Sequence, residues 1–305
     1  MSTLSLLVNY ILFYIMILIS VAFVTLLEQK LLAVMQIRVG PNNVGYAGLF
    51  QPFADAVKLF NKESIILTKG NTIIYYMSPI LSLSLSLILW LCIPMKGGGF
   101  DFNYSLMFFM VVSSVGVFPI LGSGWSSNCK YSMLGSLRSV AQMVSYEVSL
   151  GLVLLSLIWV NESFNMDVMG SSGVSMIFLL LPLSYIWFVS SLAETNRTPY
   201  DFSEGESELV SGFNTEYSSG GFTLIFMAEY SSILFMSVLL GIPFFSGSSF
   251  GLLMMFKGML VACWFIWVRG TMPRYRYDKL MGLAWKSLLP VSLFMFMFYV
   301  GVSLL

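Results

Sequence analysis

Long runs without charge divide the chain into segments of membrane-spanning length. Five runs contain no Asp, Glu, Lys or Arg: residues 1–27, 70–95, 102–129, 168–193 and 287–305. A bilayer core about 30 Å thick is crossed by about 20 residues of apolar helix, so each run can hold one span. Three further apolar segments are interrupted by ionisable residues, namely Arg138, Glu147, Glu229 and Lys257.

The pattern predicts an all-α, polytopic integral membrane protein, with a single transmembrane domain over residues 1–305 and eight transmembrane helices. The predicted spans are residues 4–27, 73–93, 103–122, 135–160, 174–193, 220–242, 249–268 and 287–305. Pro182 falls inside the fifth span. It should kink that helix, because proline removes a backbone donor.

The linker between the first two spans contains an amphipathic stretch at residues 47–61. Phe50, Phe53, Val57 and Phe60 recur there at three- and four-residue spacing. The stretch is too short to cross a bilayer, so we predict an interfacial amphipathic helix.

The basic residues test the predicted spans, because successive linkers between eight spans lie alternately on the two sides of the membrane. Thirteen of the fifteen Lys and Arg residues fall in linkers 1–2, 3–4, 5–6 and 7–8 or at their helix ends, and the other side holds only Lys96 and Lys257. By the positive-inside rule the thirteen-charge side faces the cytoplasm or the mitochondrial matrix. Both termini are then expected on the opposite side.

Composition narrows the chemistry that the chain itself can perform. The sequence is 57% hydrophobic and 10% charged, it has no net charge, and it contains no His and three widely separated Cys residues. A neutral chain gives no reason to expect nucleic acid as a partner. Without His or a Cys pair, a metal site has little support, and any redox cofactor is expected in another subunit.

Two carboxylates lie in the middle of predicted spans. Glu147 is in the fourth span and Glu229 is in the sixth. A charge at the bilayer centre costs about 3 kcal/mol, so each carboxyl is either a protonated or paired contact between helices or a functional group. Two in one chain favour a proton relay. Arg138, nine residues before Glu147, is out of phase with it and should instead contact another helix or loop.

The linker at residues 194–216 carries six acids and a single base, on the side where bases otherwise collect. A solvated acidic loop is the plain interpretation of such a run. Aromatic and aliphatic neighbours favour a folded, charged cavity. The five bases of linker 7–8 are most simply a topology signal and a lipid anchor, with binding of a partner subunit as the sharper alternative. These bases are Arg269, Arg274, Arg276, Lys279 and Lys286.

Two segments resemble the signatures of one family closely. They are Gln36–Gly45, which reads QIRVGPNNVG, and Pro199–Gly212, which reads PYDFSEGESELVSG. Glu194–Arg197, Ser145–Glu147 and Pro273–Asp278 support them. The family is that of the quinone-channel membrane subunit of respiratory complex I, the proton-pumping NADH:ubiquinone oxidoreductase.

The resemblance implies a subunit that forms the ubiquinone access tunnel and an acidic relay coupling quinone reduction to proton translocation. It implies no complete redox centre and no metal in this chain: ubiquinone is the substrate, and NADH, FMN and iron-sulfur clusters belong to partner subunits. The relay residues would be Glu147, Glu194, Asp201, Glu204, Glu206, Glu208 and Glu229. The residues of the quinone tunnel would be Glu28, Arg38, Asp55, Arg197 and Phe202.

The expected partners are the iron-sulfur and quinone-site subunits of the peripheral arm, the other membrane-arm subunits and lipids. The expected location is the mitochondrial inner membrane, or the plasma membrane in a bacterium, with both termini on the intermembrane-space side. Two alternatives remain. One is the homologous membrane subunit of a hydrogenase-type complex, and the other is a stand-alone ion-coupled transporter, against which the missing internal repeat argues.

Overall fold

The computed structural model describes residues 3–65, 67–94, 102–171, 177, 180–203, 205, 210–245 and 252–303. All regular structure in these ranges is helical. The helices are α1 (Thr3–Met35), α2 (Gln51–Asn61), α3 (Thr72–Leu89), α4 (Ser105–Val115), α5 (Val117–Ser126), α6 (Lys130–Asn161), α7 (Met166–Ser171), α8 (Leu181–Glu194), α10 (Ser219–Phe244), α11 (Leu252–Thr271), α12 (Tyr277–Leu283) and α13 (Leu289–Ser303). A π-helical turn at Ala284–Leu288 joins α12 to α13.

Seven helical segments in the described part of the chain are long and apolar enough to cross a membrane. They are Leu6–Met35, Thr72–Cys92, Ser105–Ser126, Lys130–Asn161, Ser219–Phe244, Leu253–Thr271 and Tyr277–Ser303. These segments match seven of the eight predicted spans. The fifth predicted span, residues 174–193, falls partly outside the described residues, so the count of eight stays a prediction.

Three predicted boundaries differ from the structure. The first helix continues past residue 27 to Met35, so Glu28 lies inside α1 and does not end the span. A charged residue does not stop this helix, because its carboxylate is neutralised by arginines inside the protein. The third span divides at Gly116 into α4 and α5, and the last span starts earlier than predicted, at Tyr277.

The predicted kink at Pro182 is wrong. Pro182 lies in the first turn of α8, which begins at Leu181 in the described chain and has 14 residues. The residue before the helix, Leu180, has a non-helical backbone with φ −113° and ψ 30°. Proline is favoured in the first helical turn, because its missing N–H has no intrahelical partner there. Pro182 therefore starts a helix and does not bend one.

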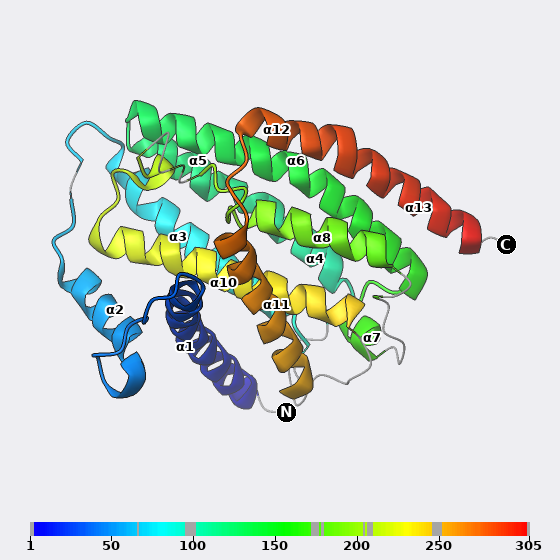
Figure 1. Cartoon of the computed structure of the whole chain (residues 1–305), viewed down its shortest axis with the longest axis horizontal. Coiled ribbons are helices and arrows are strands. Elements are labelled where there is room, and N and C mark those ends of the chain that lie inside the picture. The colour runs from blue at the N-terminus through cyan, green and yellow to red at the C-terminus, as the bar shows by residue number, and fades with distance from the viewer. Residues whose placement is uncertain are drawn as a thin grey trace.

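Helix α10 lies at the centre of the bundle and crosses the middle of Figure 1. It contacts α1, α2, α3, α7, α8 and α11. Helix α6 packs against α5, α8 and α13, and α6 and α13 lie side by side along one edge of the bundle (Figure 1). The core between these helices contains the fully buried rings of Trp187, Tyr146 and Phe235.

Small side chains on α6 allow the 194–216 linker to approach closely. The Cβ of an alanine at Gly135 would stand 2.9 Å from the backbone nitrogen of Phe213. Nearby, Ser132 is fully buried, and its hydroxyl lies 3.4 Å from the carbonyl oxygen of Phe213. Small residues let backbones meet in this way. The linker is thus packed onto the helix and is not a solvated loop at this point.

The linker between the first two spans contains α2, which contacts α1 and α10. Four apolar side chains on or next to it are exposed: Phe50, Phe53, Val57 and Phe60. The helix lies within the predicted range of residues 47–61, and its place at a membrane interface stays a prediction.

Candidate functional site

Glu28 on α1 is only 5% exposed, and it lies at the centre of a buried ion cluster. Its Oε1 accepts a bond from Arg197 at 3.4 Å and a shorter one from Arg269 on α11. Its Oε2 accepts a 2.6 Å hydrogen bond from the hydroxyl of Tyr230 on α10. A buried carboxylate is stable only when it is paired in this way. Three segments distant in sequence therefore meet on one carboxylate.

Arg197 is the most constrained cation of this cluster. Its guanidinium lies 4.3 Å from the centre of the Tyr230 ring, which is a cation–π contact. Burial acts to lower the pKa of Arg197, but Tyr230, Glu28 and Glu229 outweigh it and raise the pKa above its usual value. Arg197 is thus held charged, and it connects Glu28 electrostatically with Glu229.

The position of Arg197 follows from the turn that carries it. Helix α8 ends at Glu194, and Asn196 then adopts a left-handed backbone with φ 50°. Asparagine tolerates that conformation better than most residues. The turn is closed by a 3.2 Å hydrogen bond from the Arg197 nitrogen to the carbonyl oxygen of Leu192.

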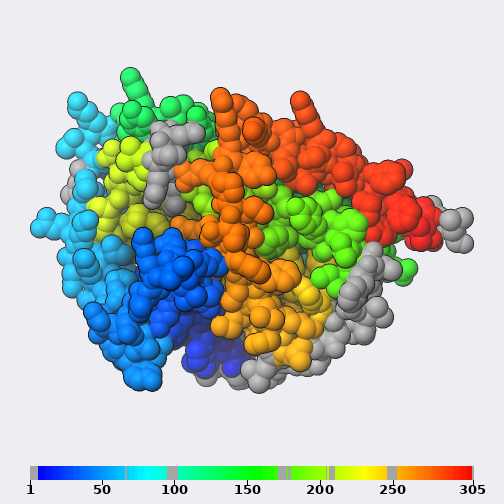
Figure 2. All heavy atoms as spheres, viewed as in Figure 1, coloured from blue at the N-terminus to red at the C-terminus, as the bar shows by residue number. Residues whose placement is uncertain are grey.

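Asp201 forms a second ion pair. Its Oδ2 lies 2.7 Å from Nη2 of Arg274, and both side chains are mostly buried. The next residue, Tyr275, donates from its backbone nitrogen to the carbonyl oxygen of Pro199 at 3.1 Å. In Figure 2 the segment that joins α11 to α12 (orange) runs across the face seen in this view. This segment therefore holds the start of the acidic linker in place.

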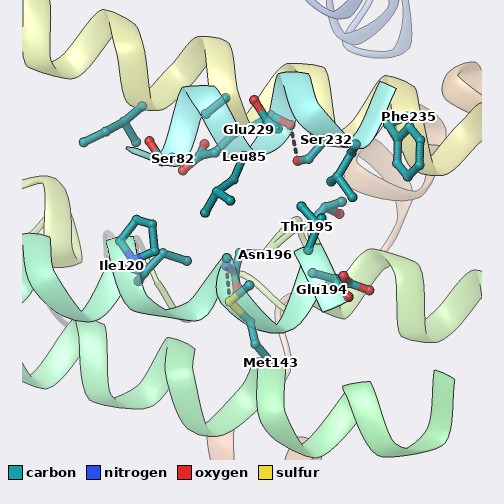
Figure 3. Close-up of a pocket in the computed structure, with 18 of the residues that line it drawn as sticks. Ser82, Leu85, Ile120, Met143, Glu194, Thr195, Asn196, Glu229, Ser232 and Phe235 are labelled. Carbon is teal, nitrogen blue, oxygen red and sulfur yellow. Dashed lines mark hydrogen bonds between the residues drawn. The ribbon is translucent and has the colours of Figure 1, made fainter. Parts of the chain in front are cut away.

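A cavity with an empty volume of about 880 Å³, counting its open mouth, lies between α3, α4, α5, α6, α8 and α10. Glu194 and Glu229 both line it. Figure 3 shows Glu229 and Ser232 on one side and Glu194, Thr195 and Asn196 on the other. The cavity brings together two carboxylates that are far apart in sequence, and its wall is otherwise mostly apolar.

Serine hydroxyls supply much of the remaining polar lining. Each donates to a carbonyl three residues earlier in its own helix. Their oxygen lone pairs can therefore accept hydrogen bonds from water in the cavity. These residues are Ser78, Ser82, Ser86, Ser113, Ser123 and Ser232.

Glu147 on α6 is half-buried and lies close enough to Glu194 for the two carboxyls to interact electrostatically. The prediction that Arg138 contacts another element is confirmed, because its guanidinium lies 5.9 Å from the centre of the Tyr277 ring on α12. Two like groups in one site resist simultaneous ionisation. Burial raises the pKa of Glu194, and the nearby carboxyl of Glu147 raises it further.

The other predicted site residues stand apart from this arrangement. Phe202 is buried, with its ring 5.9 Å from that of Tyr277. Asp55 accepts a 2.9 Å hydrogen bond from Gln51 within α2, and Arg38 is exposed. Within the described chain, no hydrogen bond or ion pair joins Arg38 or Asp55 to the clusters above. Glu204, Glu206 and Glu208 lie outside the described residues.

Sequence reasoning missed three members of the clusters. For Arg269 and Arg274 the sequence predicts a topology signal and lipid anchor, or a contact with a partner subunit, and this is incomplete, since both pair with buried carboxylates of this chain. Tyr230 carried no sequence signal, apart from its place directly after Glu229. The excess of acidic residues in the 194–216 linker is the one sequence feature that indicates pairing with basic residues elsewhere in the chain.

Comparison with known proteins identifies the family. The family described as NADH dehydrogenase matches residues 8–300. The chain belongs to this family. Its NADH dehydrogenase relatives include NADH-ubiquinone oxidoreductase chain 1 of Aedes aegypti, 53% identical over 300 residues, or 98% of this chain and 96% of that protein.

Further NADH dehydrogenase relatives with the same name come from other animals. The protein of Locusta migratoria is 53% identical over 299 residues, covering 97% of this chain and 95% of its own length. The protein of Branchiostoma lanceolatum is 48% identical over 288 residues, covering 94% and 92%. The resemblance carried by Gln36–Gly45 and Pro199–Gly212 is thereby confirmed.

Proposed function

We propose that this chain is a membrane subunit of NADH-ubiquinone oxidoreductase in the mitochondrial inner membrane. It forms part of the ubiquinone access tunnel and carries an acidic relay that couples quinone reduction to proton translocation. Electron transfer takes place in partner subunits, which hold NADH, FMN and the iron-sulfur clusters. The names of the animal relatives support this assignment.

The observation that carries the relay is the cavity shared by Glu194 and Glu229. Glu147 acts electrostatically on Glu194 at one end, and Glu229 acts on Arg197 at the other. Arg197 in turn pairs with Glu28. A change of charge at one carboxyl therefore alters the electrostatic field at the next charged group, which is what a relay requires.

The quinone path is assigned to the region of the Glu28 cluster. A second, much smaller pocket, with an empty volume of about 310 Å³ that counts its open mouth, is lined by Glu28, Arg197, Tyr230 and Arg269, together with apolar residues of α1, α10 and α11. An apolar wall with a few convergent polar groups suits a ligand that has a polar head and an apolar tail. Arg38, Asp55 and Phe202 are proposed to border the same tunnel.

The proposed surroundings follow from this role. The charged linkers face the matrix and contact the iron-sulfur and quinone-site subunits of the peripheral arm. Other membrane-arm subunits and lipids cover the apolar sides, and α2 lies in the membrane interface with Phe50, Phe53, Val57 and Phe60 directed to lipid.

Glu229→Gln tests the relay. This variant removes the ionisable group and keeps its shape, so the assembled complex should lose most of its coupled quinone reductase activity without losing its subunits. Ser232→Ala is the matched control, since Ser232 lines the same cavity and bonds only the Glu229 carbonyl of its own helix at 2.7 Å. Glu206→Gln should behave like Glu229→Gln.

Unchanged turnover and proton pumping in assembled Glu229→Gln complexes would remove Glu229 from the relay. Solute uptake by liposomes that contain this chain alone would replace the whole proposal with a transporter. Co-purification with a nickel-iron hydrogenase subunit would favour the hydrogenase-type alternative.

A further inference from the structure

One fully buried amide ties α6 to the turn that carries the charged residues. Gln142 on α6 is 0% exposed. Its Nε2 donates to the carbonyl oxygen of Ala193 at 2.7 Å and to that of Tyr200 at 2.8 Å. Both hydrogen atoms of the amide are thus used, and both bonds cross to a segment more than 50 residues away in sequence.

The two carbonyls stand at the two ends of one turn, residues 193–201, which we call the charged turn. It carries three ionisable side chains into three different environments. Glu194 lines the cavity, Arg197 enters the Glu28 cluster and Asp201 pairs with Arg274. The bonds of Gln142 fall on the residues directly before Glu194 and directly before Asp201.

We propose that Gln142 is a positioning residue that fixes the charged turn, and with it the carboxyl of Glu194, relative to Glu147 on α6. Gln142 and Glu147 share helix α6, five residues apart. An element that anchors Glu194 to α6 therefore sets the separation of the two carboxyls. Electrostatic interaction falls with distance, so a loosened anchor changes the interaction of the two carboxyls. This inference rests on the proposed function.

Other polar contacts hold the charged turn to α1 and to the segment after α11, but few hold it to α6. Among the described residues, Asn196 Oδ1, Thr198 Oγ1 and Asp201 Oδ1 are buried without a hydrogen-bond partner. The further side-chain contact from α6 is a long one of 3.8 Å, from Asn196 Nδ2 to the sulfur of Met143. The two bonds of Gln142 are therefore the main polar link between α6 and this turn.

Gln142→Met is the test, because methionine fills a similar volume and donates no hydrogen bond. In the assembled complex, turnover per complex should fall about fivefold to thirtyfold, as expected for loss of one or two net hydrogen bonds of about 1 kcal/mol each that orient a reacting group. The number of protons pumped per electron should also fall, and the pH of half-maximal turnover should move. A purely structural residue would change the yield of complex and leave these last two quantities unaltered.

Ser149→Ala is the matched control. Ser149 is also fully buried on α6, and among the described residues its hydroxyl bonds only the Tyr146 carbonyl of the same helix, at 2.9 Å. This variant should keep the wild-type turnover, proton ratio and pH profile. If Gln142→Met does not assemble, Gln142→Asn takes its place, since its shorter amide cannot reach both carbonyls and should give the same changes in weaker form.

Glu194→Gln, measured in parallel, separates the possible failures. The positioning role is overturned if the Gln142 variant matches Ser149→Ala in all three readouts while Glu194→Gln lowers turnover. It is also overturned if the Gln142 variant loses turnover and Glu194→Gln does not, because the effect then bypasses Glu194. If neither variant differs from wild type, the proposed relay falls together with the positioning role.

Discussion

Replacing Glu28 with glutamine should destabilise the chain strongly, because it leaves the charge of Arg197 buried without its partner. The side chain of Glu28 is 7% exposed and that of Arg197 is 14% exposed, so neither can turn to water. Arg269 is 36% exposed and can rehydrate. Removing one partner of a buried ion pair costs about 3–5 kcal/mol, much of it from the charge left behind.

The exposed pair of Arg276 and Asp278 provides the control. Its atoms lie 3.1 Å apart, but the side chains are 78% and 73% exposed. Pairs of this kind contribute about 0–1 kcal/mol. Asp278→Asn should therefore leave the thermal midpoint of the assembled complex nearly unchanged, whereas Glu28→Gln lowers it by several degrees.

The double variant Glu28→Gln with Arg197→Gln isolates the cause. If the cost comes from the unpaired cation, removing the cation as well should restore part of the loss, with a coupling of about 1–3 kcal/mol. In the assay, the purified complex is heated stepwise, and the amount of this chain that remains bound is measured at each temperature. Two results would refute the reasoning: Glu28→Gln equal to Asp278→Asn, or strictly additive effects in the double variant.

Two further predictions concern packing and the quinone path. Gly135→Ala should cost about 1–3 kcal/mol and lower the thermal midpoint, because the added Cβ would stand 2.9 Å from the Phe213 nitrogen, whereas Gly301→Ala, with nothing within 4 Å, should be neutral or slightly stabilising. Equal midpoints for the two variants would contradict this. A photoreactive quinone analogue should label linker 1–2 or 5–6 of this chain in the complex, and labelling confined to other subunits would argue against the tunnel.

The sequence was sufficient to predict seven of the helical segments, though not their exact ends, because apolar runs of membrane length arise from a local pattern. It did not predict which charges pair. Arg269 lies 241 residues from Glu28 and Arg274 lies 73 residues from Asp201, and no periodic pattern connects positions so far apart. The bases of linker 7–8 satisfied the positive-inside rule completely, so nothing in their number indicated a second role.

The sequence also did not predict the cavity. Ser82 and Ser86 line it, whereas Ser149 is buried between packed helices. All three hydroxyls make the same kind of bond to a carbonyl three residues earlier. A serine in a membrane helix satisfies its donor locally in either place, so only the arrangement of the helices distinguishes a polar lining from a packing contact.

The carboxyls at this site are of two kinds, those paired with an arginine and those beside another carboxyl. Glu229 lies between the two kinds. Glu28 and Asp201 pair with arginines at short range, whereas Glu194 is buried and has a second carboxyl, Glu147, near it. Glu229 lines the cavity with Glu194 and also acts on Arg197. A ligand that displaced Arg197 from Glu28 would change the electrostatic field at Glu229. In the proposed relay, the permanently charged Arg197 would thereby pass a change in ligand position on to the carboxyls that line the cavity.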